Sequence, residues 1–104
     1  MARQEMTSII YDKKGRVLSI GKNSYTKTHT LQAKHSAKVG TPERIFMHSE
    51  CNAVVKCKAL HKAYRIKVFR YGKNGKALLA KPCAACMSLI SETPIEVIEW
   101  TVTE

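Results

Sequence analysis

Two short motifs, each at the start of a predicted helix, most strongly constrain how this chain can fold. His48-Ser49-Glu50 begins a stretch, from His48 to His61, in which apolar residues recur at helical spacing. Pro82-Cys83-Ala84-Ala85-Cys86 opens a second helical stretch, because proline is tolerated in a first helical turn. Imidazole and thiolate are both ligands that zinc prefers. A fold that uses the two motifs together must therefore bring two helix starts to one point.

Strand-like and helix-like patterns alternate around these motifs. We expect strands over 7–11, 16–20, 64–71 and 95–102, and the turn at 12–15 makes the first two a hairpin. The polar segment 25–43 reads either as a functional lid or arm or as a plain surface connection, with a short helix over 31–39. The order β-β-α-β-α-β predicts one α/β domain over residues 1–104, with helices on a mixed sheet of about four strands.

Composition narrows the class of protein further. No apolar run is long enough to span a bilayer, and Met1–Ser8 lacks the apolar core of a signal peptide. We therefore expect a cytoplasmic protein with no membrane partner. In that compartment the four cysteines are expected to be thiols or metal ligands rather than disulfides.

Charge is large and uneven, with a formal net value of +10. All 18 Lys and Arg residues lie between Arg3 and Lys81, whereas Pro82–Glu104 carries acids only. Such a field favours a phosphate-bearing partner, either a nucleotide or a nucleic acid, although it could also serve solubility alone. No ladder of aromatic residues for a single strand is evident, which favours a small molecule.

The motif chemistry predicts a catalytic zinc site. His48, Cys83 and Cys86 supply three ligands, which leaves a fourth position for water. The Cys-x-x-Cys spacing puts both sulfurs at one helix N-terminus, where the helix dipole favours thiolates. Glu50 can face the same site only if His48 lies where the chain enters the helix. Glu50 would then move protons without binding the metal.

A structural zinc site with four thiolates is the alternative. It would use Cys51 and Cys57 together with Cys83 and Cys86. Two positions six residues apart on one helix meet a single ion poorly, and buried free thiols are the simpler reading of Cys51 and Cys57.

The motifs also carry a family resemblance. Residues 48–53, His-Ser-Glu-Cys-Asn-Ala, resemble the H-A-E-x-N-A block of deoxycytidylate deaminases, and residues 81–86 resemble their second block. Gly21-Lys22-Asn23 is similar to the G-x-N element that closes the second strand there. The chain thus resembles the cytidine/deoxycytidylate deaminase superfamily, in the compact format of phage domains. This implies a three-layer-type α/β sandwich and, for a phage protein, the host cytoplasm.

The resemblance implies an activity and a set of substrate contacts. The reaction would be hydrolytic deamination of a cytosine-containing nucleoside or nucleotide, with zinc-bound hydroxide attacking the amidine carbon and Glu50 as proton shuttle. Asn23 would contact the sugar, and the backbone at Ser49 would approach the base. Tyr25 could stack on the base, and Pro82 of the second block is also expected to contact the substrate.

Two other functions remain open at this point. The substrate could be cytosine or adenine within single-stranded DNA or RNA, or the chain could be a non-catalytic nucleic-acid-binding protein with structural zinc. The chain also looks trimmed relative to the family, without its usual N-terminal helix and fifth strand. Because trimming exposes apolar faces and strand edges, we expect a homo-oligomer.

Overall fold

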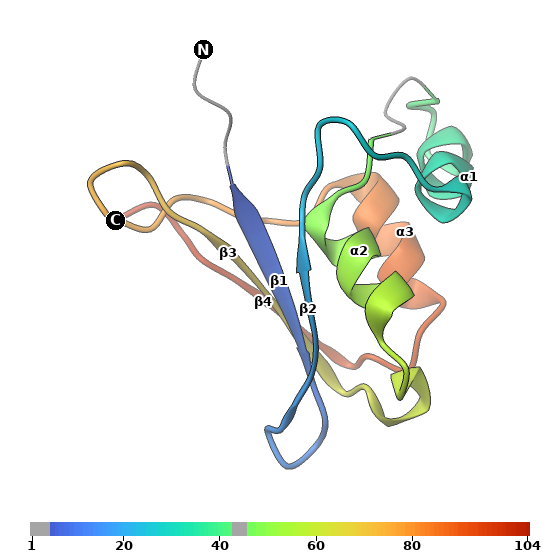
Figure 1. Ribbon diagram of the computed structural model, residues 1–104, viewed down its shortest axis with the longest axis horizontal. Helices are drawn as coiled ribbons and strands as arrows, with labels where there is room; N and C mark the ends of the chain where they lie inside the picture. Colours follow the sequence, from blue (N-terminus) through green and yellow to red (C-terminus); the bar gives the residue numbers. More distant parts are fainter. Residues whose placement is uncertain (1–4, 43–45) are drawn as a thin grey trace.

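A computed structural model describes residues 5–42 and 46–104 (Figure 1). The elements in chain order are β1 (Met6–Tyr11), β2 (Val17–Lys22), α1 (Thr30–Lys38), α2 (Ser49–Lys56), the 3-10 helix η1 (Leu60–Lys62), β3 (Arg65–Arg70), α3 (Ala84–Ser91) and β4 (Val97–Trp100). The expected strands and helices are all present. The sequence also predicts a short apolar entry to the second motif at residues 45–47, which lies partly outside the described residues.

The four strands form one mixed sheet in the order β2-β1-β3-β4. β1 is antiparallel to both β2 and β3, whereas β3 and β4 run parallel. A parallel pair needs a long crossover, and α3 lies within the one that joins β3 to β4. The sheet matches the prediction of a mixed sheet of about four strands.

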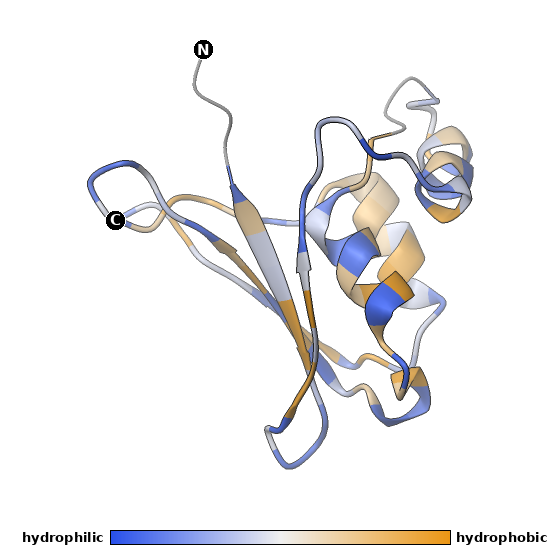
Figure 2. Cartoon of the chain, viewed as in Figure 1, coloured by the Kyte–Doolittle hydropathy of each residue, from blue (hydrophilic) through white to orange (hydrophobic). Residues whose placement is uncertain are grey.

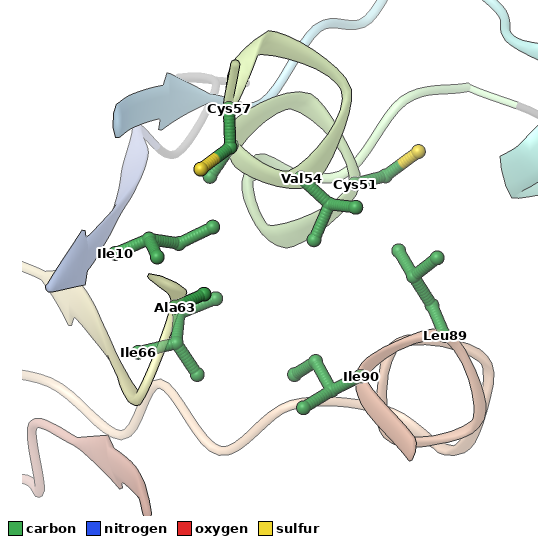
Figure 3. Close-up of a cluster of buried hydrophobic side chains, with 9 residues drawn as sticks. Ile10, Cys51, Val54, Cys57, Ala63, Ile66, Leu89 and Ile90 are labelled. Carbon is green, nitrogen blue, oxygen red and sulfur yellow. The ribbon is translucent and has the colours of Figure 1, made fainter. Parts of the chain in front are cut away.

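The hydrophobic core lies between the sheet and two helices. Ile10 and Ile66 point from the sheet towards Val54 of α2 and towards Leu89 and Ile90 of α3 (Figure 3). α2 packs on β1 and β2, and α3 packs between α2 and α1. α3 is hydrophobic over most of its length, whereas the turns at both ends of the sheet are hydrophilic (Figure 2). This packing orients the N-termini of α2 and α3 towards the same end of the sheet.

All three helices lie on one side of the sheet (Figure 1). The expected α/β class is confirmed, and in the described residues its helices form a single layer. No described helix covers the opposite face of the sheet, which we call the open face. None of the helices in residues 5–42 and 46–104 has the length and apolar character of a membrane span.

Some element boundaries differ from the prediction. α2 ends at Lys56 rather than His61, because Cys57 adopts an extended backbone and turns its thiol into the core. α3 begins at Ala84 rather than Pro82, with Cys83 as its N-cap. β4 is shorter than expected and ends at Trp100.

The polar segment before α2 is not simply a surface arm. α1 buries Gln32, His35 and Ser36 against the rest of the domain. A histidine in a polar segment is expected to be solvated, and for His35 this expectation is wrong, since it is 1% exposed and its Nδ1 lies 2.9 Å from Ser88 Oγ on α3. Glu92 at the end of α3 pairs with Lys34 of α1 at 3.5 Å, and its other carboxylate oxygen lies 3.2 Å from His35 Nε2.

Candidate metal centre and catalytic site

Three potential metal ligands meet at the N-termini of α2 and α3. His48 Nδ1 lies 3.2 Å from Cys86 Sγ and 3.5 Å from Cys83 Sγ. The three ligand atoms all lie within 4.8 Å of one another. Zinc bonds of about 2.0–2.1 Å to nitrogen and about 2.3 Å to sulfur imply tetrahedral N···S edges of about 3.6 Å. The distances and the donor chemistry therefore fit a zinc ion.

Helix caps explain why these side chains converge. His48 is the N-cap of α2 and Cys83 the N-cap of α3, both with extended backbone and without a side-chain capping bond. Cys86 lies in the first turn of α3. Two positive helix ends thus face the same point, which favours thiolate ligands. This confirms the expectation that two helix starts come together.

The two cysteine thiols shift each other's pKa in opposite directions. Hydrogen bonds from the Cys86 thiol and from His48 lower the pKa of Cys83 to about 3, against the effect of burial. The Cys83 thiolate, burial and the Glu50 carboxylate raise the pKa of Cys86. Only one of the two can be a thiolate readily, and a bound divalent cation would favour both.

α1 supports the metal-ligand candidate His48 through a hydrogen bond to its backbone. The backbone N–H of His48 donates to Oε1 of the buried Gln32 at 3.2 Å. This bond fixes the position at which the chain enters α2. The sequence analysis missed Gln32, because a lone glutamine in a polar segment gives no signal of burial.

Glu50 lies beside the ligand group and outside it. It is the second residue of α2, and its side chain is buried, with 3% of its surface exposed. Ser49 Oγ donates to Glu50 Oε1 at 2.7 Å, and Ser8 Oγ on β1 lies 2.7 Å from Ser49 Oγ and 3.5 Å from the same carboxylate oxygen. Because His48 precedes the helix, the two side chains can face one site, as the sequence requires. Ser8 was not foreseen.

A cavity of about 370 Å³ opens over Glu50 and the ligand group. The other residues that line it are Met6, Asn23, Ser24, Tyr25, Phe46, Met47, Ser49, Arg70, Leu79 and Lys81, with His48 and Cys83 from the ligand group. Three of the four predicted substrate-contact residues, Asn23, Tyr25 and Ser49, therefore lie at the cavity. Pro82 is buried next to Cys83 and is not among the lining residues.

Two of these residues also have a clear structural role. Asn23 Oδ1 accepts a hydrogen bond from the backbone N–H of Met6 at 2.9 Å, which ties the end of β2 to the start of β1. The Ser49 side chain is directed to Glu50 and Ser8 rather than to the cavity. Arg70 and Lys81 add positive charge to the cavity wall, and neither was predicted.

The four-thiolate alternative is wrong. Cys51 and Cys57 are buried in the hydrophobic core, and their sulfurs point in different directions from α2 (Figure 3). Burial raises the pKa of Cys51 to about 11, which opposes the thiolate form that a metal needs. All four cysteines are free thiols in this structure.

Comparison with known proteins identifies the fold. No protein-family model matches the chain, and no curated protein matches it in sequence. Among solved structures, a mutant cytidine deaminase from Mycobacterium tuberculosis superposes with a TM-score of 0.51 and 19% sequence identity, over 98% of this chain and 74% of that one.

The chain has the cytidine deaminase fold. The family resemblance of the motifs is thus confirmed for the fold, although the sequence identity to that structure is low. Within this fold, the ligand group stands at the N-termini of α2 and α3, with Glu50 beside it.

Proposed function

We propose that the chain is a zinc-dependent hydrolytic deaminase of a cytosine-containing nucleoside or nucleotide. One observation carries this proposal: a buried carboxylate, Glu50, lies beside a group of three ligands that does not include it. A structural zinc site closes with a fourth protein ligand and has no use for such a carboxylate. The similar protein from Mycobacterium tuberculosis is a cytidine deaminase, which agrees with this reaction class.

His48, Cys83 and Cys86 would hold the metal. When bound, zinc supplies a Lewis acid that lowers the pKa of a water in its open position towards about 7. Ser49 and Ser8 both bond to Oε1 of Glu50, so we assign proton transfer to Oε2. Glu50 takes a proton from the attacking water and gives it to the ring nitrogen. It carries the second proton to the leaving amino group, which departs as ammonia.

The cavity walls suggest how the rest of the substrate is held. We propose that Asn23 contacts the sugar, that Tyr25 stacks on the base and that the backbone at Ser49 approaches it. Pro82 would act by fixing the backbone ahead of Cys83. Arg70 and Lys81 line the same cavity, so a phosphate-bearing substrate is favoured over a neutral nucleoside.

The test is Glu50→Gln in the zinc-loaded protein. Ammonia release should fall by about 10²–10⁴-fold, because the proton shuttle is lost, while bound zinc and thermal stability are retained. Glu96→Gln, which neutralises an exposed carboxylate outside the cavity, is the matched control and should leave turnover unchanged. Undiminished turnover in Glu50→Gln would contradict the mechanism.

A polymer substrate is the second candidate, and the cationic cavity wall favours testing it. Cytidine, cytidine and deoxycytidine phosphates, and single-stranded oligonucleotides containing cytosine or adenine should be compared side by side. Turnover of free nucleotides alone supports the lead proposal. Turnover of oligonucleotides alone would instead identify nucleic acid as the substrate. Zinc binding without turnover of any of them supports the non-catalytic alternative.

We also propose that the protein acts in the cytoplasm, where its four free thiols persist, and that it is a homo-oligomer. Val55 on α2 and Met87 on α3 are 43% and 38% exposed, and β2 stands at an edge of the sheet. A neighbouring copy could cover these apolar groups and that edge. Size-exclusion chromatography with light scattering measures the mass in solution. A mass equal to one chain would contradict the proposed homo-oligomer.

A further inference from the structure

The open face of the sheet carries aromatic rings, of which Tyr11 and Phe69 are paired with cations. Alternation along the strands places Ile9 and Tyr11 of β1 on this face, because Ser8 and Ile10 are buried beneath the helices. For the same reason Arg65, Lys67 and Phe69 of β3 lie on it, since Ile66 and Val68 are buried.

Three cation–aromatic pairs run from the hairpin turn to β3, and the two that involve Arg65 and Lys67 lie on this face. The cation lies 5.7, 4.7 and 5.2 Å from the ring centroid in the pairs Lys13–Tyr64, Arg65–Tyr11 and Lys67–Phe69. We call these six residues the cation–aromatic row. Lys13, Tyr64 and Arg65 line one shallow cavity, which connects the turn to the start of β3.

The row continues to the far end of β3. Tyr71, 53% exposed, lines a further cavity of about 340 Å³ together with Phe69, Thr7 and Ile9. Tyr64 to Tyr71 covers about 23 Å at about 3.3 Å per residue. That length suits several nucleotides of a single strand, which commonly occupies sites of about 4–16 nucleotides.

The charge of the row is suited to phosphate. Two acids next to it are paired, Asp12 with Arg16 at 2.8 Å and Glu99 with Arg65 at 3.4 Å, whereas Glu5 lines the cavity beside Tyr71. Lys13 and Lys67 have contacts to aromatic rings and lack ion pairs among those formed by the described residues. Within a chain of net charge +10, the row leaves cations for a polyanion.

We propose that the cation–aromatic row binds single-stranded nucleic acid. Aromatic rings stack on bases while neighbouring Lys and Arg side chains contact phosphates. Bases are accessible for stacking only when they are unpaired, so a single strand is favoured over a duplex. No ladder is evident in the sequence, because Tyr11 joins the segment of Tyr64 and Phe69 only through the pairing of β1 with β3.

A second copy of the chain is a poorer occupant of this face. A symmetric dimer presents the same patch from both copies. Docking the row on itself would therefore bring Lys13, Arg65 and Lys67 of one copy against the same cations of the other. Such like-charge contact is unfavourable, whereas a polyanion gains from all three.

Binding is best measured without chemistry, on full-length zinc-loaded protein. Fluorescence anisotropy with a labelled 12-nucleotide thymidine strand gives affinity while offering no cytosine or adenine to deaminate. Wild type should bind this strand at 50 mM salt and bind the matching duplex at least fivefold more weakly. Affinity should fall as salt rises, since phosphate contacts release counterions.

Two variants test the cations of the row. K13Q/K67Q should lower affinity about tenfold or more at 50 mM salt and reduce the salt slope by roughly 1.4, for two phosphates at about 0.7 each. K56Q/K58Q removes the same charge from exposed positions at the end of α2 and should change affinity less than twofold. Equal losses in both double variants would show net charge alone at work and overturn the proposal.

A third variant tests stacking. Tyr71→Ala should weaken binding about fivefold or more, because each stacked base contributes about 1–3 kcal/mol. Thermal melting of each variant, close to that of wild type, confirms that the fold is kept. Equal affinity for duplex and single strand, or a Tyr71→Ala variant that dissociates a dimer with no effect on the strand, would overturn the assignment.

The proposal is independent of the deaminase reaction. Glu50→Gln should bind the thymidine strand as tightly as wild type does. K13Q/K67Q should keep turnover of a free nucleotide, because its two lysines are not among the lining residues of the catalytic cavity. The two proposals can therefore fail separately.

Discussion

The two faces of the same sheet are used in opposite ways. On the helix-covered face, Ile10, Ile66 and Ser8 have no exposed surface, and Ser8 reaches the carboxylate of Glu50. On the open face, Ile20 is 49% exposed, and Lys or Arg side chains lie over aromatic rings, as Arg65 does over Tyr11. The strand residues that point to the helices thus serve both the core and the catalytic site. The residues between them point to the open face and can contact a partner. Substitutions should therefore separate by face more than by strand.

The largest effect should come from Gly21, where β2 approaches α2 most closely. A Cβ at this position would lie 2.2 Å from the backbone nitrogen of Ala53 and 2.5 Å from the carbonyl oxygen of Ser49. Because backbone cannot move aside as a side chain can, Gly21→Ala should cost more than about 4 kcal/mol of unfolding free energy. Urea unfolding followed by circular dichroism measures this loss.

Gly72→Ala is the matched control for Gly21→Ala. Its nearest neighbours would be side-chain atoms of Asn74 and Leu78 at 3.3 and 3.5 Å, which can shift. A loss below about 1 kcal/mol is expected, as for most substitutions away from packed backbone. If both variants unfold alike, the close approach of β2 to α2 does not set the position of the site.

Two adjacent isoleucines of β1 offer a direct comparison of the faces. Ile10 belongs to the core, whereas Ile9 is only partly buried, on the open face. Ile10→Ala should cost about 3 kcal/mol, since it removes buried methyl groups and leaves a cavity. Ile9→Ala should cost about 1 kcal/mol or less. Chemical denaturation of both variants tests this, and equal losses would mean that the open face is covered in solution.

Sequence patterns predicted the covered face well. Helix caps, ligand spacing and alternation located His48, Cys83, Cys86 and Glu50, because local chemistry decides where a helix begins and which side chains its first turn presents. The strands were found for a similar reason, since Ile66 and Val68 repeat with period two.

Contacts between segments that are distant in the chain could not be predicted from the sequence. Gln32 and Ser8 support the site from α1 and β1, and nothing in their local sequence distinguishes them from surface polar residues. The cation–aromatic row was missed for the same reason. Tyr11 meets Arg65 through the register of β1 with β3, which no single segment specifies.

Ser8 tests whether the covered face contributes to catalysis as well as to folding. Ser8→Ala removes the hydroxyl that lies 2.7 Å from Ser49 Oγ. A neutral hydrogen bond of about 1 kcal/mol corresponds to about a fivefold fall in kcat. KM should stay unchanged, because Ser8 is not among the cavity-lining residues. Thr7→Ala, on the open face of the same strand, should alter neither constant, and a change in KM alone would argue against a positioning role for Ser8.

The smallest effect should come from the hairpin turn, which belongs to neither face but presents Lys13 to the row. A hydrogen bond from the backbone N–H of Arg16 is the main cause that lowers the pKa of Asp12 below its usual value of 3.8, with help from the Arg16 side chain and the Lys14 backbone. Because the folded pKa lies below the unfolded one, the stability this carboxylate provides is present above about pH 4 and is lost as pH falls through the folded pKa. Asp12→Asn should therefore melt slightly below wild type at pH 7, and the difference should vanish on acidification. Arg16→Gln keeps the backbone donor, so this variant should retain most of the pH dependence of stability. If the pH dependence is lost completely in this variant, the ion pair between the Arg16 and Asp12 side chains causes the effect instead.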